Sequence, residues 1–93
     1  MRQLFKAEVR LPRKARIVTQ GYRPTLSFSG EKVLSNFDEI EPNPLRPSDV
    51  GRATIRTWWD RSGKSPILPG AKFEVLEAER CVGDGVVVAM LPG

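Results

Sequence analysis

The sequence of 93 residues contains no histidine and a single cysteine, and these two scarcities exclude several kinds of active site. Without histidine, the chain cannot build a serine-histidine-aspartate triad, a cysteine-histidine pair or an imidazole metal site. One cysteine can form neither an internal disulfide nor a thiolate zinc cluster. Cys81 opens an apolar segment, so we predict that it is a small buried hydrophobic residue. We expect no metal ion and no cofactor.

Long apolar runs and helical periodicity are also missing. No run approaches the roughly 20 apolar residues of a membrane-spanning helix, and the N-terminus lacks the apolar stretch of a signal peptide. A cytoplasmic location is therefore the default expectation. No window repeats its apolar residues every 3.6 positions over three turns, so we expect no long helix. The length suits one domain with a small core, spanning residues 1–93.

The remaining polar residues do not form a recognisable catalytic set. Asp38, Glu39 and Glu41 lie in a segment where nothing obvious would raise a carboxyl pKa. Ser62-Gly63-Lys64-Ser65 matches the second half of a phosphate-binding loop, but Trp58 stands where its first glycine is required. We therefore expect that the protein is not an enzyme.

What the chain does contain is a series of short segments in which apolar and polar residues alternate, separated by glycine and proline turns. Such segments predict strands. They cover residues 5–11, 25–29, 52–59 and 72–78, and a weaker pattern predicts a short strand near 33–34 followed by irregular chain. A nearly continuous apolar run predicts the last strand at 80–91. Residues 39–49 carry three prolines and are expected to form an extended surface loop. Six short strands predict an all-β fold, a small six-stranded antiparallel closed barrel, because closure removes exposed sheet edges.

The last predicted strand is the most apolar part of the chain. From Val82 onward it is rich in β-branched residues, which predicts a strand buried on both faces with neighbours on both sides. Gly83-Asp84-Gly85 lies between strand residues, so we predict a bulge there and not a cradle for a ligand.

Positive charge is concentrated near the N-terminus. Residues 1–32 carry eight basic and two acidic groups, a net charge of +6, whereas the remaining residues carry seven basic and nine acidic groups, a net charge of −2. A basic region of this kind contacts phosphate or an acidic partner, or is simply a solvated surface.

A second group of cations accompanies a pair of tryptophans. Arg52, Arg56 and Trp58 fall on one face of the strand predicted at 52–59, and Trp59 points to the opposite face. Cations beside an exposed indole suit either a nucleic-acid backbone or a protein partner. The alternative is that the tryptophan packs in the core and the aliphatic parts of the arginine side chains lie over it. The candidate RNA-binding or partner-binding residues are therefore Arg13, Lys14, Arg16, Arg23, Arg52, Arg56, Trp58, Arg61 and Lys64.

The order of these landmarks resembles a known family. Phe5-Lys6-Ala7-Glu8-Val9 opens the first strand, Gly21-Tyr22-Arg23-Pro24 precedes the second, and Val82-Gly83-Asp84-Gly85-Val86-Val87 begins the last. With the turn at Leu45–Asp49 and the segment Gly70–Phe73, they resemble, across residues 4–91, the C-terminal third β-barrel domain of bacterial translation elongation factor Tu.

The resemblance implies a six-stranded barrel without catalytic residues that contacts the T stem of aminoacyl-tRNA, a GTPase domain and an exchange factor. It therefore implies a tRNA-like RNA or a protein as the partner, with no membrane and no small-molecule substrate. Two departures stand out. The family's double glycine before the last strand corresponds to Ala78 and Glu79, and the pair Trp58-Trp59 has no family counterpart.

Overall fold

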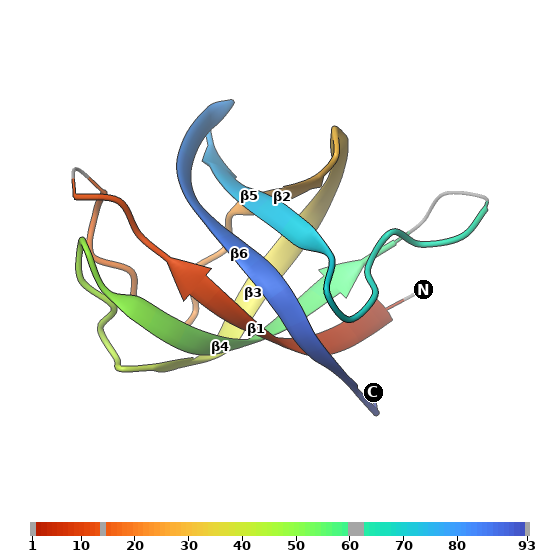
Figure 1. Ribbon diagram of the computed structural model, residues 1–93, viewed down its shortest axis with the longest axis horizontal. Coiled ribbons are helices and arrows are strands. Elements are labelled where there is room, and N and C mark those ends of the chain that lie inside the picture. The colour runs from red at the N-terminus through yellow and green to blue at the C-terminus, as the bar shows by residue number, and fades with distance from the viewer. Residues whose placement is uncertain (1, 14, 60–62, 93) are drawn as a thin grey trace.

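The computed structural model describes residues 2–13, 15–59 and 63–92, which form six antiparallel strands in one closed barrel (Figure 1). The strands are β1 (Arg2–Arg10), β2 (Thr25–Phe28), β3 (Glu31–Glu41), β4 (Val50–Trp58), β5 (Lys72–Glu77) and β6 (Arg80–Leu91). Around the barrel they follow the order β1-β4-β3-β2-β5-β6, with β6 closing on β1. The predicted all-β, six-stranded antiparallel closed barrel is confirmed. Within the described ranges there is no helix that could cross a membrane.

The interior of the barrel is filled by one face of each strand. In β1 the predicted alternation holds, and Phe5, Ala7 and Val9 are buried. The ring of Phe5 packs edge-on against the rings of Phe28 and Phe73, with centroid separations of 6.5 and 6.3 Å. These two rings lie 5.4 Å from each other. Three phenylalanines from β1, β2 and β5 thus form an aromatic part of the core, and side chains occupy the space inside the strands.

β3 is much longer than the short strand that the sequence predicts near residues 33–34. Its register shifts once, because Phe37 lies opposite Ile55 whereas Glu39 lies opposite Thr54, which leaves Asp38 as an extra residue in a β-bulge. The inserted residue interrupts the two-residue period, so a single continuous strand looks in sequence like a strand followed by irregular chain. The bulge also turns Asp38 toward the polar residues on the outside of the barrel.

The segments 11–24 and 42–49 meet at one end of the barrel. Leu11 N–H donates to Asp49 O at 3.2 Å, and Val18 and Leu45 exchange two backbone hydrogen bonds of 2.8 Å. The predicted surface loop at 39–49 is therefore wrong in two respects. Its first residues belong to β3, and the side chain of Leu45 is completely buried. Prolines keep this segment out of the sheet, but they do not prevent an apolar side chain from covering the core.

β6 is hydrogen-bonded to β1 on one side and to β5 on the other, as the sequence predicts, but it is not buried on both faces. Val87 points inward and is buried, whereas 45 % of the surface of Val88 is exposed. A closed barrel has only one interior, so the outer face of a strand with two neighbours still meets solvent. Val88 is itself an extra residue, because Ala7 pairs with Val87 and Lys6 pairs with Ala89.

A bulge lies at the entry of β6, but its extra residue is Val82, because Val75 pairs with Gly83 and Leu76 with Cys81. The bulge predicted at Gly83-Asp84-Gly85 is wrong in position, because these residues pair in regular register with β5. This register places Cys81 opposite Leu76 on the outer side, where it is exposed. The prediction of a buried cysteine is therefore wrong. Partial burial is the main cause that raises the pKa of the Cys81 thiol, and hydrogen bonding to Glu74 adds to it.

The hairpin between β5 and β6 has a two-residue turn at Ala78 and Glu79. Both residues have positive φ angles, 50° and 68°, and Glu77 pairs directly with Arg80 across the turn. Positive φ at both central residues is the conformation in which glycine and asparagine are most favourable. Ala78 and Glu79 adopt this conformation although both carry side chains.

Candidate binding surfaces

β4 presents a polar outer face that contains one large indole. Arg56 and Trp58 point outward, while Ile55 and Thr57 point inward and are fully buried. Trp58 is 45 % exposed and Trp59 is only 6 % exposed. The structure thus decides which of the two adjacent tryptophans faces solvent, a choice that the alternating pattern alone leaves open.

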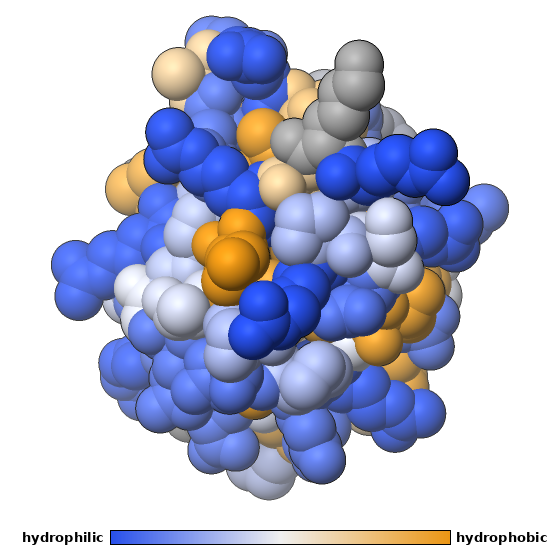
Figure 2. All heavy atoms as spheres, turned by 90° about the vertical axis from the view of Figure 1, so that its left-hand side faces the viewer, coloured by the Kyte–Doolittle hydropathy of each residue, from blue (hydrophilic) through white to orange (hydrophobic). Residues whose placement is uncertain are grey.

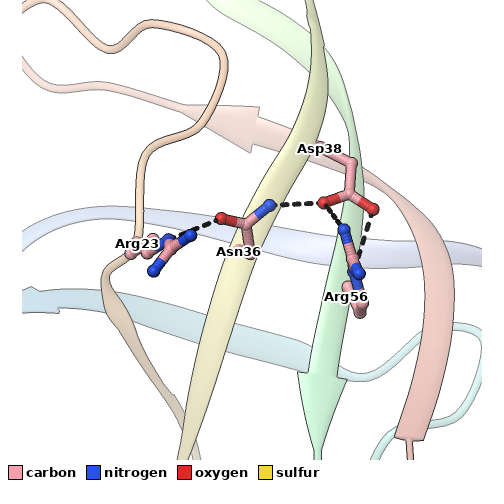
Figure 3. A network of polar contacts seen from close by, with 4 residues as sticks. All are labelled: Arg23, Asn36, Asp38 and Arg56. Carbon is pink, nitrogen blue, oxygen red and sulfur yellow. Dashed lines mark hydrogen bonds and ion pairs between the residues drawn. The ribbon is translucent and has the colours of Figure 1, made fainter.

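A chain of hydrogen bonds links Arg56 on β4 to Arg23 in the segment before β2, across two residues of β3 (Figure 3). Asp38 accepts two hydrogen bonds from Arg56, from Nε at 3.1 Å and from Nη2 at 2.7 Å. The amide nitrogen of Asn36 donates to Asp38, and the amide oxygen of Asn36 accepts from Arg23 Nε at 3.1 Å. The order along the surface is therefore cation, amide, carboxylate, cation.

The bulge in β3 makes this chain possible, because it places Asp38 beside Asn36 while Asn36 pairs directly with Arg56. Arg56 also lies over the neighbouring indole, with its Cζ 5.9 Å from the centre of the Trp58 ring, a cation–π contact that orients both side chains. Arg56 is thus engaged by one carboxylate and one aromatic ring. We name the exposed group of Arg23, Leu34, Asn36, Arg56 and Trp58 the Trp58 face.

The Asp38 and Arg56 pair predicts a specific pH dependence. The hydrogen bond from Arg56 is the main cause that lowers the pKa of Asp38 below its ordinary value of 3.8. A carboxyl whose pKa is lower in the folded state stabilises the fold above its unfolded pKa, and this stabilisation is lost as the pH falls through the folded pKa. We therefore expect the wild type to lose stability below about pH 4 by an amount that Asp38→Asn does not lose.

Urea denaturation at a series of pH values, with both proteins measured in parallel, checks this expectation. Because the pair is partly exposed, the difference should be small at neutral pH and should shrink further in high salt. A variant whose pH profile runs parallel to that of the wild type would show that Arg56 does not hold the Asp38 carboxylate in solution.

The other predicted residues on this side of the barrel do not join the Trp58 face. Arg52 is exposed on β4, but its register partners are Glu8 on β1 and Glu41 on β3. Its charge therefore lies between two carboxylates, which makes it a poor phosphate ligand. Lys64 is exposed in the connection between β4 and β5. Lys14 and Arg61 lie outside the described residues.

A separate basic surface forms at the end of the barrel where segments 11–24 and 42–49 meet. Arg13 belongs to the turn 12–15, closed by a 3.0 Å hydrogen bond from Ala15 N–H to Pro12 O. Arg46 begins the turn 46–49, closed by a 3.0 Å bond from Asp49 N–H to Arg46 O. Leu11 bonds to both Ser48 and Asp49, so the two turns are adjacent. Figure 2 shows this end of the molecule, where hydrophilic residues cover most of the surface.

Arg16 extends this surface. Its side chain is 84 % exposed, and its nearest carboxylate, Glu77, is 3.9 Å away, which neutralises little of its charge. We name the group of Arg13, Arg16 and Arg46 the basic end. No local sequence pattern points to Arg46, because the turns that carry Arg13 and Arg46 are joined by hydrogen bonds between segments more than 30 positions apart.

The structure therefore places five of the predicted binding residues on two surfaces with different chemistry, which are the Trp58 face with Arg23, Arg56 and Trp58 and the basic end with Arg13 and Arg16. Comparison with protein-family models finds none that matches this chain, and comparison with curated proteins finds no match either. Function is thus inferred from the two surfaces themselves. The basic end offers exposed cations with few carboxylates, and the Trp58 face offers an indole, an exposed leucine and cations held in fixed positions.

Proposed function

We propose that this protein is a non-enzymatic RNA-binding barrel, of the kind that forms the third domain of elongation factor Tu, and that it contacts the RNA backbone through the basic end. The observation that carries the proposal is the meeting of the turns 12–15 and 46–49, which brings the segments of Arg13 and Arg46 together from two distant parts of the sequence, with Arg16 directly after the first turn. Exposed arginines grouped in this way neutralise phosphates without requiring a catalytic or a base-reading pocket.

The electrostatic balance of the basic end supports this role. Among the described residues of segments 11–20 and 42–49, Asp49 is the one acidic residue, and one of its carboxylate oxygens accepts the backbone N–H of Arg46 at 3.0 Å. The three arginine side chains therefore face solvent with little internal neutralisation. The whole chain carries a net charge of +4, which also favours encounter with a polyanion.

The test is the salt dependence of binding to a fluorescein-labelled RNA stem-loop, measured by anisotropy. If the three arginines neutralise three phosphates, raising the salt from 50 to 200 mM should weaken binding roughly 20- to 40-fold. Replacing all three with glutamine should remove most of the affinity, and each single replacement should reduce the slope by about one unit.

Arg52→Gln is the matched control for this experiment, because it removes the same charge from a position between Glu8 and Glu41. It should leave both affinity and salt slope unchanged. Absence of RNA binding at low salt, or a triple variant that keeps the wild-type slope, would overturn the proposal.

A second candidate function, protein binding through the Trp58 face, is favoured by a different observation. Trp58 and Leu34 are paired across β4 and β3 and are both exposed, although large apolar side chains are usually covered. Tryptophan and arginine are also the residues that most often dominate the affinity of protein interfaces. Trp58→Ala should then weaken the free energy of binding to a protein partner by roughly 2 kcal/mol or more and leave RNA binding unchanged.

A further inference from the structure

The Trp58 face contains a hollow on the outer surface of the barrel, between Arg23 on one side and Trp58 on the other. Its volume is about 480 Å³, and its lining consists of Arg23, Leu34, Ser35, Asn36, Arg56 and Trp58. Leu34 is 68 % exposed and pairs with Trp58 across the strands, so the two form a continuous apolar strip beside the polar residues. A hollow of this kind has room for one or two side chains of a partner.

The cations around the hollow differ in how far their charge is already balanced. Arg56 gives two hydrogen bonds to the carboxylate of Asp38, so this pair contributes almost no net charge. Arg23 bonds through Nε to the neutral amide of Asn36 instead. Among the described residues, no carboxylate oxygen lies within 4 Å of the Arg23 side chain. Of the two arginines that line the hollow, Arg23 is therefore the one whose charge no described carboxylate offsets.

Arg23 is also held in place before any ligand arrives. Asp38 accepts from Asn36, which fixes the amide with its oxygen toward Arg23, as Figure 3 shows. The bond to Asn36 uses Nε, so it does not occupy the terminal nitrogens of the guanidinium. A cation fixed in this manner loses less conformational freedom on binding and suits a two-pronged contact with a carboxylate.

We propose that this hollow binds a segment of a partner protein that carries an aspartate or glutamate next to an apolar side chain. The carboxylate pairs with Arg23, and the apolar side chain packs on Leu34 and Trp58. The proposal rests on the second candidate function above and adds the chemistry of the partner. Charge complementarity carries it, since Arg23, which has no carboxylate within 4 Å among the described residues, adjoins the apolar strip.

An RNA backbone fits the same hollow less well. Successive phosphates would approach the carboxylate of Asp38, and the Arg56 nitrogens that could hold a phosphate already donate to that carboxylate. A single carboxylate at Arg23 avoids both problems. The neighbouring charges thus discriminate against a continuous polyanion while accepting an isolated acid.

The experiment is selection of a random peptide library displayed on phage against the folded wild-type chain, with counter-selection against Trp58→Ala. Selected peptides should be enriched in aspartate or glutamate adjacent to leucine or an aromatic residue. Their affinity, measured by anisotropy, should fall about tenfold or more with Arg23→Gln and with Leu34→Ser. Arg23→Lys, which keeps the charge but not the paired nitrogens, should retain part of it.

Two matched controls accompany these variants. Val50→Ala removes an exposed apolar side chain from the same strand as Trp58, and Arg52→Gln removes an arginine from that strand. Both should bind the selected peptides like the wild type, and the denaturation midpoint of every variant establishes that it is folded.

The outcomes separate the partner chemistry from the function on which it rests. Peptides that depend on Trp58 but contain no acidic residue would overturn the proposed chemistry and leave protein binding in place. Failure to select any peptide that depends on Trp58 would overturn both. Competition by the RNA stem-loop for this hollow, or self-association that Trp58→Ala abolishes, would also overturn the proposal, because the occupant would then be RNA or a second copy.

Discussion

Phe5→Ala should lower the free energy of unfolding by about 4 kcal/mol. The side chain is completely buried at the centre of β1, and its ring packs against the rings of Phe28 and Phe73. Removing it deletes the burial of a whole aromatic ring and opens a cavity that strands of a closed barrel cannot easily collapse to fill. Because small domains are stable by only about 5–15 kcal/mol, this single change should bring the protein near its unfolding threshold.

Urea denaturation followed by far-ultraviolet circular dichroism measures the effect. Leu34→Ala is a suitable control, because it also removes a large apolar side chain but from an exposed position on β3, and it should change stability by less than about 1 kcal/mol. A loss of 1 kcal/mol or less for Phe5→Ala would show that the core is packed differently from this structure.

Gly85→Ala should lower the free energy of unfolding by about 3 kcal/mol, although it adds only a methyl group. A Cβ at this position in β6 would lie 2.5 Å from Cζ of Phe73 and 2.6 Å from the backbone oxygen of Glu8. The oxygen belongs to the neighbouring strand and cannot rotate away, so either β1 and β6 separate or the phenylalanine leaves its place. The glycine is therefore required by the close approach of β1 and β5 to this point of β6.

The residues next to Gly85 supply the comparison. Asp84 lies on the same strand, and its side chain is exposed. Asp84→Ala should therefore change the free energy of unfolding by less than about 1 kcal/mol. The loss of stability caused by Gly83→Ala should lie between those of Asp84→Ala and Gly85→Ala, since the new Cβ would lie 2.9 Å from the backbone oxygen of Arg10. Equal stability of all three variants in denaturation experiments would contradict the tight strand contacts described above.

The fold could be predicted from the sequence wherever the two-residue period is unbroken. The inward set of β1 follows from alternation, and so does the placement of Trp58 and Trp59 on opposite faces, although alternation alone does not tell which of the two faces solvent. Two of the errors occur at inserted residues. The extra residue Asp38 interrupts the alternating pattern, so most of β3 does not look like a strand in the sequence. The extra residue Val82 shifts the register of β6, and Cys81 therefore lies on the outer side. A bulge depends on how two strands fit together, and one strand read alone does not contain that information.

The candidate surfaces were predictable only in part, for the same reason. The sequence places Arg56 and Trp58 on one face of a strand, but it does not indicate that the carboxylate of Asp38 balances Arg56. It points to Arg13 and not to Arg46, because their turns are joined by long-range backbone hydrogen bonds. Contacts between strands and between loops determine which charged side chains are already balanced within the protein. These contacts join residues far apart in the sequence, so they become visible only in the folded barrel.

The opposite orientations of Trp58 and Trp59 give the protein two optical reporters at adjacent positions. The indole of Trp59 is shielded, so its emission should shift to longer wavelength only when the chain unfolds, whereas the indole of Trp58 should respond to whatever covers the outer hollow. Trp59→Phe leaves Trp58 as the single indole for a titration, and Trp58→Phe leaves Trp59 as the single indole for a melting curve, so neither measurement requires an attached dye.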